Sequence, residues 1–386
     1  MQFLPQDQLQ AFLAHLAGRA QVVAPVAQEG VVLFRPWTPG TAVELDVLLA
    51  KQSAKEYIFR QTETYLRYGY VMEGPSSVEE TMPDTAHGEA ATVESADSKV
   101  PAEVKAHEVL TLDPLNEAVE QVIFGLRPCD ARGFAQMDNV FGGYGGFYFD
   151  PLYNAKREAT TLLAVTCVDP RSTCFCTAVG GDPAGTEGAD ALFTQVEGGF
   201  TVEALTPKGE AALDFAGLAA AAGGQSDAAA AVKTAATDRV VAPFDGMSVA
   251  KHLHDNLEDP AWHDLAMRCI SCGTCTYVCP NCYCFNINDE MVEGKGERFR
   301  TWDNCFNPSY TLETSGHNPR ELKVKRFRNR FSHKFWYYPE KYDSLLCSGC
   351  GRCIMHCPTR IDIREVLGTM GVPRTGAAAS MAGEGA

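Results

Sequence analysis

Two stretches of the chain repeat one cysteine pattern, and this pattern constrains the fold more than any other feature. The first stretch, CISCGTCTYVCP, holds Cys269, Cys272, Cys275 and Cys279, and the second, CSGCGRCIMHCP, holds Cys347, Cys350, Cys353 and Cys357. Both have the spacing C-x2-C-x2-C-x3-C-P. A backbone that carries this pattern must wrap closely around whatever the thiols bind.

The spacing is typical of [4Fe–4S] binding, in which three thiolates of a run hold one cluster and the fourth holds the other. The ligand sets are therefore Cys269, Cys272, Cys275 and Cys357 for one cluster, and Cys347, Cys350, Cys353 and Cys279 for the second. Gly273 and Gly351 permit close backbone approach and an unusual φ. Structural zinc sites share the C-x2-C element, but two complete copies with a terminal Cys-Pro weigh against zinc.

A third group of cysteines lies far upstream of these runs. It consists of Cys129, in GLRPCDARG, and Cys167, Cys174 and Cys176, in TCVDPRSTCFC. The segments 121–126 (QVIFGL) and 160–166 (TTLLAVT) read as apolar strands, and the segment 131–142 between them has helical spacing. Apolar strands that alternate with helices predict parallel pairing.

If these strands are parallel neighbours, Cys129 and Cys167 emerge at the same carboxyl edge, where open α/β sheets bind ligands. The loop before Cys174 contains Pro170 and can turn back toward that edge. Four thiols would then converge, and we predict that they hold a third [4Fe–4S] cluster. A zinc ion, or structural thiols without metal, remain the alternatives.

These patterns predict an α+β fold, with an N-terminal α/β-like domain over residues 1–245 and a helical, ferredoxin-like domain with two clusters over 246–370. The segment 191–205 reads as a hairpin around Glu-Gly-Gly. Residues 75–103 carry seven acids, one lysine and no aromatic residue, which indicates a solvated insertion. We expect residues 371–386 to be a disordered tail.

Three cysteines, Cys282, Cys284 and Cys305, exceed the needs of the three predicted clusters. They could hold a further metal or form a redox-active pair. Small, buried thiols near the clusters are the simpler interpretation, because free cysteine is often buried.

Charge narrows the range of partners. The net charge of −16 argues against nucleic acid or an anionic membrane as a bulk partner, because phosphate binding needs positive potential. The basic segment 320–341 is interpreted as a solvated helix face or a docking strip for an acidic partner.

With no apolar run of membrane-spanning length and no signal-peptide pattern at the start, we expect a cytoplasmic location. Motifs for nicotinamide binding and for hydrolysis are absent from the sequence.

Several stretches together resemble one protein family. They are KEYIFRQTETYLRYGY, VIFGLRPCDARGF, DPRSTCFCTAVGGDP, CPNCYCFNINDE, RTWDNCFNPSYTLETSGHN, RNRFSHKFWYYPEKY and CSGCGRCIMHCPTRIDI. Over residues 50–365 the chain resembles the iron–sulfur subunits of the anaerobic sulfite reductase A type and the sulfhydrogenase beta type, which form one family. The acidic insertion at 75–103 departs from the family pattern and leaves the identity of the partner open.

The resemblance implies a role inside a cytoplasmic, multi-subunit oxidoreductase. In that family a partner subunit carries FAD and exchanges electrons with NAD(P)H. The iron–sulfur subunit relays the electrons to a catalytic partner, which is a sulfite reductase, a hydrogenase or a heterodisulfide-reductase type of unit. The expected function is therefore single-electron relay, without a catalytic residue on this chain. The alternatives are an iron–sulfur redox sensor or regulator, and a stand-alone enzyme that reduces thiol or sulfur compounds.

Overall fold

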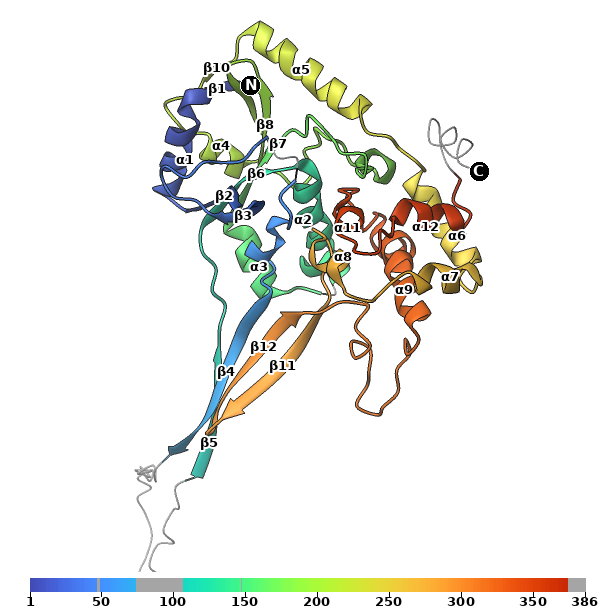
Figure 1. The fold of residues 1–386 in the computed structure, drawn as a ribbon. Coiled ribbons are helices and arrows are strands. Elements are labelled where there is room, and N and C mark those ends of the chain that lie inside the picture. Colours follow the sequence, from blue (N-terminus) through green and yellow to red (C-terminus); the bar gives the residue numbers. More distant parts are fainter. Residues whose placement is uncertain (47–48, 74–106, 147, 374–386) are drawn as a thin grey trace, which may run out of the picture. The chain divides into compact units, whose positions relative to one another are not determined.

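In the computed structural model, an eight-stranded β-sheet with a parallel centre forms the frame for the upstream cysteines (Figure 1). The structure describes residues 1–46, 49–73, 107–146 and 148–373. The strand order is β10-β1-β9-β8-β7-β6-β2-β3. The strands are β1 (Gln2–Pro5), β2 (Gln21–Gln28), β3 (Val31–Pro36), β6 (Gln121–Leu126), β7 (Thr160–Val165), β8 (Ala191–Val196), β9 (Gly199–Ala204) and β10 (Ala219–Ala220).

The centre of this sheet confirms the predicted strand pairing. β6 pairs in parallel with β7 on one side and with β2 on the other, and β7 pairs in parallel with β8. The hairpin predicted over 191–205 is the antiparallel pair β8–β9. All six residues of β6 are buried, as expected for a strand with both faces covered.

Successive residues of the central strands supply two separate cores, because strand side chains alternate between the faces of a sheet. Phe124 and Leu163 belong to one core, which α1 (Leu9–Ala17) and α4 (Pro207–Ala212) cover. Ile123 and Leu162 belong to the other core, which α2 (Pro128–Phe141) and α3 (Pro151–Glu158) cover. A further helix, α5 (Gly223–Asp238), packs on β8 and β9.

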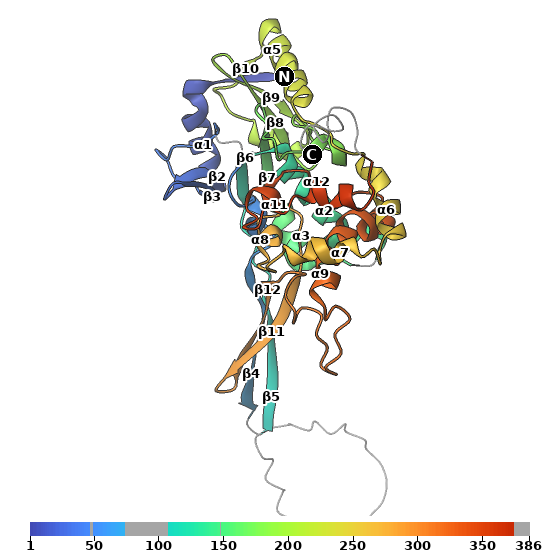
Figure 2. The same cartoon turned by 45° about the vertical axis from the view of Figure 1, so that its right-hand side comes forward.

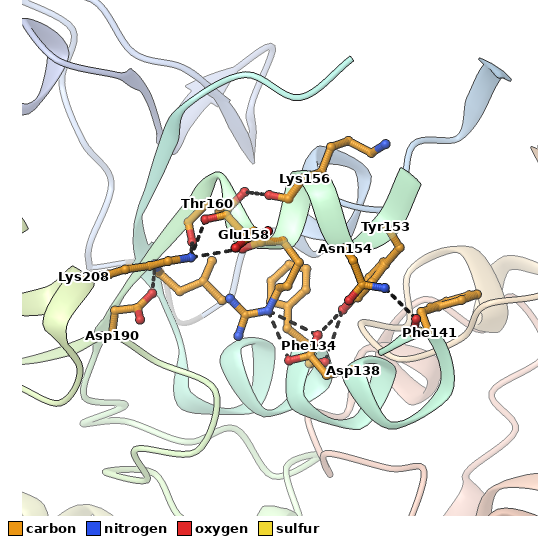
Figure 3. Close-up of polar contacts among 12 residues, drawn as sticks. Phe134, Asp138, Phe141, Tyr153, Asn154, Lys156, Glu158, Thr160, Asp190 and Lys208 are labelled. Atoms are coloured by element: carbon orange, nitrogen blue, oxygen red, sulfur yellow. Dashed lines mark hydrogen bonds and ion pairs between the residues drawn. The ribbon is translucent and has the colours of Figure 1, made fainter. Parts of the chain in front are cut away.

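Polar contacts hold α3 against α2, the helix that begins beside Cys129 (Figure 3). The Tyr153 hydroxyl donates to Asp138 Oδ1 at 2.6 Å, and Asn154 Nδ2 donates to the Phe141 carbonyl at 2.6 Å. Lys208 Nζ donates to the carbonyl oxygens of residues 158 and 160, at 2.5 and 3.2 Å. These bonds satisfy main-chain oxygens at the end of α3 and keep α2 in place over the sheet.

The downstream part of the chain is built from short helices around the two cysteine runs. They are α6 (Val249–Asp255), α7 (Ala261–Met267), α8 (Thr274–Tyr277), α9 (Lys323–Ser332), the π-helix η6 (His333–Tyr337), α10 (Tyr338–Tyr342), α11 (Arg352–Met355) and α12 (Ile363–Thr369). The short 3₁₀ turns of the chain are η1 (Gln6–Gln8), η2 (Ala54–Tyr57), η3 (Tyr144–Gly146), η4 (Cys176–Val179) and η5 (Gly246–Ser248). Both views place α2, α8 and α11 close together (Figures 1 and 2).

The two cysteine runs have the same backbone conformation. Gly273 (φ 73°) and Gly351 (φ 72°) are left-handed residues that start the one-turn helices α8 and α11. Two residues before each glycine, Ser271 (φ 58°) and Gly349 (φ 65°) are also left-handed. The pattern of two left-handed residues around the second cysteine therefore recurs in both runs, as the predicted role of Gly273 and Gly351 requires.

The second run lies directly against the upstream cysteines. A Cβ atom on Gly349 would lie 2.5 Å from the Cys176 Cα, and one on Gly351 would lie 2.5 Å from the Thr173 carbonyl oxygen. The Phe175 amide donates to the Gly349 carbonyl at 2.8 Å. Only glycine permits backbones to approach this closely, so these two positions join the second run to the TCFC segment.

Contacts divide the chain into two units, of which the larger comprises Met1–Thr62, Asn116–Asn286 and Thr301–Ala386. The smaller unit comprises Glu63–Leu115 and Ile287–Arg300. Its sheet has the order β11-β12-β4-β5, from β4 (Thr62–Glu73), β5 (His107–Pro114), β11 (Phe285–Val292) and β12 (Lys295–Trp302). β4 and β5 are antiparallel, and both views draw the four strands as a long ribbon (Figures 1 and 2).

The region 246–370, expected to be helical, also contains two strands. Strands β11 and β12 interrupt it, because they complete a sheet with β4 and β5, which lie far upstream in the sequence. The mixed α+β content agrees with the expected class. The domain boundary at residue 245 stays a prediction. The acidic insertion over 75–103 lies entirely outside the described residues, and of the expected tail only 371–373 are described, so both expectations stay predictions.

Among the residues that the structure describes, no helix combines the length and the apolar character needed to cross a membrane.

Replacing Gly349 with serine should destabilise the larger unit, although the equivalent position of the first run already is a serine, Ser271. The backbone conformation is similar at both positions, but at Gly349 the added Cβ would overlap Cys176. We expect a cost of roughly 1–3 kcal/mol from overpacking, measured as a lower thermal midpoint. Ser271→Gly is the matched control and should change the midpoint little. Equal midpoints for Gly349→Ser and the parent would contradict the close approach.

Candidate iron–sulfur centres

Five cysteines from the two runs line one cavity, and four of them form one predicted ligand set. Its walls include Cys269, Cys272, Cys275 and Cys357, together with Phe306, Phe331 and Ile363. These are the four cysteines that the spacing assigns to one cluster. α8 carries Cys275, the residues before it carry the first two thiols, and Cys357 follows α11. A set of four thiols in an apolar cavity fits a [4Fe–4S] cluster.

Backbone amides point at two thiols of this first set. The Ser271 amide donates to Cys269 Sγ at 3.3 Å, and the Ile361 amide donates to Cys357 Sγ at 3.2 Å. Burial raises the pKa of Cys269 and Cys275. Burial also tends to raise the pKa of Cys357. Hydrogen bonds, among them those from the Thr359 hydroxyl and the Ile361 amide, outweigh burial and lower this pKa. The amides favour thiolate sulfur, the form that iron binds.

The second set is the more buried one. Cys279, Cys347 and Cys350 are buried, and Cys353 is half-buried. Burial raises the pKa values of Cys347, Cys350 and Cys353, and the charge of Cys279 acts in the same direction on each. A hydrogen bond with Cys282 and then burial raise the pKa of Cys279 to about 12. Because the charge of Cys279 acts on each of the other three thiols, the four lie in one interior region.

The third set also lines one cavity, which contains Cys129, Cys167, Cys174 and Cys176 with Pro128, Pro170 and Pro183. Cys129 lies in the first turn of α2, directly after β6, and Cys167 follows β7. Both positions lie at the carboxyl edge of the parallel strands, as the sequence predicts. Burial raises the pKa of Cys167 to about 11 and that of Cys176 to about 12.

The three sets adjoin one another. Cys353 of the second set lines the cavity of the first. Cys350 and Gly349 of the second run line the cavity of the third. The Cys174 thiol donates to the Cys350 carbonyl at 3.8 Å. The ligand assignments stay predictions. The first and third sets each line one cavity, and cysteines of the second run border both cavities.

Comparison with known proteins agrees with these centres. Residues 268–361 match the family described as a 4Fe-4S dicluster domain. The chain is 30% identical over 251 residues to the Sulfhydrogenase 2 subunit beta of Pyrococcus furiosus. The aligned residues cover 64% of this chain and 72% of that protein. The chain belongs to the sulfhydrogenase beta subunit family. No solved structure matches it. As a member of this family with [4Fe–4S]-type centres, the chain is an iron–sulfur electron-transfer subunit of an oxidoreductase.

A buried ion pair connects the second and third thiol sets of this subunit. Arg352 starts α11, and its guanidinium donates to Asp130 of α2 through two bonds, at 2.5 and 2.9 Å. The side chains are 0% and 1% exposed. Arg352 Nε also donates to the Ala50 carbonyl at 3.0 Å. Although burial lowers the pKa of Arg352, the Asp130 carboxylate and the Cys350 thiolate raise it above its usual value, so the guanidinium stays charged between the two sets.

Three more cations are buried around the second set. They are Lys55, Arg330 and Lys334, with exposures of 2%, 5% and 3%. Lys55 Nζ donates to the Cys282 carbonyl at 2.7 Å and lies 3.9 Å from the centre of the Trp302 ring. Arg330 donates to the Cys275 carbonyl at 2.9 Å and to Cys282 Sγ at 3.5 Å. In the part of the chain that the structure describes, none of the three pairs with a carboxylate.

The surplus cysteines lie in the same region. The pKa of Cys282 is lowered to about 6, mainly by a hydrogen bond with Cys279. The charges of Lys334 and Arg330 also lower it, whereas burial acts to raise it. Burial raises the pKa of Cys305 to about 12, and the neighbouring Cys284 raises it further. All three are half-buried. Their interpretation as small thiols beside the clusters stays a prediction.

Sequence reasoning missed these buried cations. The basic segment 320–341 was interpreted as a solvated face or docking strip, and for Arg326, Arg330 and Lys334 this is wrong, since all three are buried. Their spacing of four residues puts them on one helical face, directly beside a similarly spaced row of phenylalanines at 327, 331 and 335. That coincidence of a basic and an apolar row was the signal available in the sequence.

Breaking the buried ion pair should be costly. Arg352→Met leaves the Asp130 carboxylate uncompensated, and we expect the loss of about 3–5 kcal/mol of stability, read as a lower thermal midpoint. Combining Arg352→Met with Asp130→Leu should restore part of the lost stability, because the double variant has no unpaired buried charge at this position.

The exposed pair Arg298–Asp289 is the control for this experiment. Asp289→Asn should change the midpoint little, because exposed ion pairs are screened by water. A double variant as unstable as Arg352→Met would contradict the role given to the unpaired charge.

Proposed function

We propose that this subunit relays single electrons between a flavin subunit that uses NAD(P)H and a catalytic partner, through three [4Fe–4S] clusters in series. The observation that carries the proposal is the adjacency of the three thiol sets. Cys353 borders the first cavity, and Cys350 borders the third. When bound, each cluster takes up and gives up one electron at a time.

The two ferredoxin-type sets fit their clusters by donor chemistry and surroundings. Each set consists of four thiols, with three from one run and the fourth from the other. The left-handed positions around the second cysteine of each run turn the backbone about its thiols. Main-chain amides near Cys269 and Cys357 already donate to sulfur, which favours the thiolate form.

Several features support a third cluster at the sheet edge. The four thiols line one cavity, and Cys129 and Cys167 come from neighbouring parallel strands. Among the described residues, no three His, Cys, Asp or Glu side chains are placed to hold a single metal ion. This favours a cluster over zinc, whose four ligands must close on one point at about 2.0–2.3 Å.

The first and second sets differ in exposure, which suits a relay. Cys272 of the first set is exposed, so a partner can approach that end. The second set is enclosed, and the close approach of Gly349 to Cys176 keeps the third set beside it. Short distances between carriers favour transfer along the series over loss to solvent.

The partner classes come from the family. The relative from Pyrococcus furiosus is named as a subunit of a sulfhydrogenase, and we propose that this chain likewise acts within a multi-subunit, cytoplasmic complex. Its flavin subunit would carry FAD. A sulfite reductase, hydrogenase or heterodisulfide-reductase type of unit would complete the pathway.

Iron and acid-labile sulfide should each number about twelve per chain, since each of three cubane clusters contains four. Replacing Cys174 and Cys176 with serine should reduce both to about eight. Cys305→Ser, which removes a thiol outside the three sets, should leave them at about twelve. A parent value near eight that the double serine variant leaves unchanged would remove the third cluster from the proposal.

The isolated chain should not be reduced by NADH, because the proposal gives the flavin to a partner. Under anaerobic conditions we expect dithionite to bleach the visible absorption of the clusters and NADH alone to leave it unchanged. NADH should become effective when the flavin subunit is added. Rapid bleaching by NADH alone would contradict a separate flavin subunit.

A further inference from the structure

Lys334 makes direct contact with a predicted cluster ligand inside the protein. Its Nζ donates to Cys279 Sγ at 3.4 Å, to Asn281 Oδ1 at 2.9 Å and to the Leu346 carbonyl at 2.7 Å. A protonated lysine has three donors, and here each has an acceptor. The ammonium is therefore held against the sulfur rather than left free to reach solvent.

A chain of amides fixes this arrangement. Asn281 is 0% exposed, and its Nδ2 donates to Gln136 Oε1 at 2.6 Å. The Gln136 amide in turn donates to the carbonyl oxygens of Leu345 and Cys347. Because both amide groups are committed, Asn281 Oδ1 faces both Lys334 and the Cys279 thiol, which donates to it at 2.8 Å.

The backbone around Lys334 is also unusual. Lys334 lies in the π-helix η6, which separates α9 from α10. π-helical turns are rare and recur at functional sites. The carbonyl of Lys334 accepts a bond from the Leu346 amide at 3.0 Å, so the turn is tied through its backbone to the residue that precedes Cys347.

The charge of Lys334 has no carboxylate to balance it among the described residues. Its acceptors are a sulfur, an amide oxygen and a carbonyl. Arg330, which is also buried and donates to Cys282 Sγ, adds a second positive charge nearby. Isolated buried charge is expensive, so the region is built to hold negative charge.

We infer that Lys334 raises the reduction potential of the cluster held by Cys279. The inference rests on the proposed ligand sets. Reduction adds one electron, supplied by the partner's flavin, and thus one negative charge. An ammonium in contact with a ligand sulfur stabilises the reduced state more than the oxidised one, and the effect is strong in a dry interior. Hydrogen bonds to ligand sulfurs act in the same direction.

Lys334→Met and Lys334→Gln test this inference on the full-length, cluster-loaded chain. Both remove the charge, and the glutamine keeps a polar group that can bond to Leu346. An anaerobic redox titration followed by electron paramagnetic resonance measures the midpoint of each cluster. We expect one midpoint to fall, so that the ratio of reduced to oxidised cluster drops about tenfold at a fixed potential, or about 59 mV for one electron.

Two controls identify the signal. Cys279→Ser should alter the same signal that moves in the Lys334 variants. Lys251→Met removes an exposed lysine of α6 that pairs with Asp255 and should move no midpoint. Unchanged midpoints in both Lys334 variants would overturn the inference. Loss of the Cys279 cluster from both would assign Lys334 to cluster assembly and would also overturn it.

Iron analysis of the same samples separates this inference from the relay itself. A parent chain with about eight irons would remove the third cluster, while the effect of Lys334 on the Cys279 signal could still be read. A parent chain with about twelve irons and unmoved midpoints would keep the relay and remove the role of Lys334.

Discussion

Negative charge that has to be held in a dry interior is the constraint on which the larger unit depends. Thiolates that bind iron carry charge, and a buried charge is tolerated only with compensation. The chain supplies buried cations for this compensation. Arg352 adjoins the second and third sets, Arg330 lines the first cavity, and Lys334 contacts Cys279. Asp130 balances only Arg352.

One of these charge pairs also joins the sheet edge to the second cysteine run within the larger unit. Asp130 directly follows Cys129 at the sheet edge, and Arg352 lies two residues after Cys350 in the second run. Their ion pair therefore ties the sheet edge to the second set. Gly349 and Gly351 bring the backbones together at the same junction, and Gly133 of α2 lies so close to Pro280 that a Cβ there would approach within 2.8 Å. Rigid spacing of this kind suits carriers whose separation controls the rate of electron transfer.

Much of the fold could be predicted because local patterns determine it. The apolar segments 121–126 and 160–166 are parallel strands, and the hairpin over 191–205 is present. The paired strands β11 and β12 could not be predicted in the same way. Their partner strands β4 and β5 lie far away in the chain, and alternating, partly exposed residues such as those of β11 carry a weak local signal.

For the site, the sequence by itself determined the chemistry. The number and spacing of the cysteines specify thiol ligands in sets of four, because a cluster needs that many from a closely wrapped backbone. Only the tertiary structure decided which charges surround those thiols. Arg352 and Asp130 are 222 residues apart, and Lys334 reaches Cys279 across 55. Such pairs form because the fold brings distant residues together in an interior where a buried charge needs compensation, and burial is a property of the folded chain.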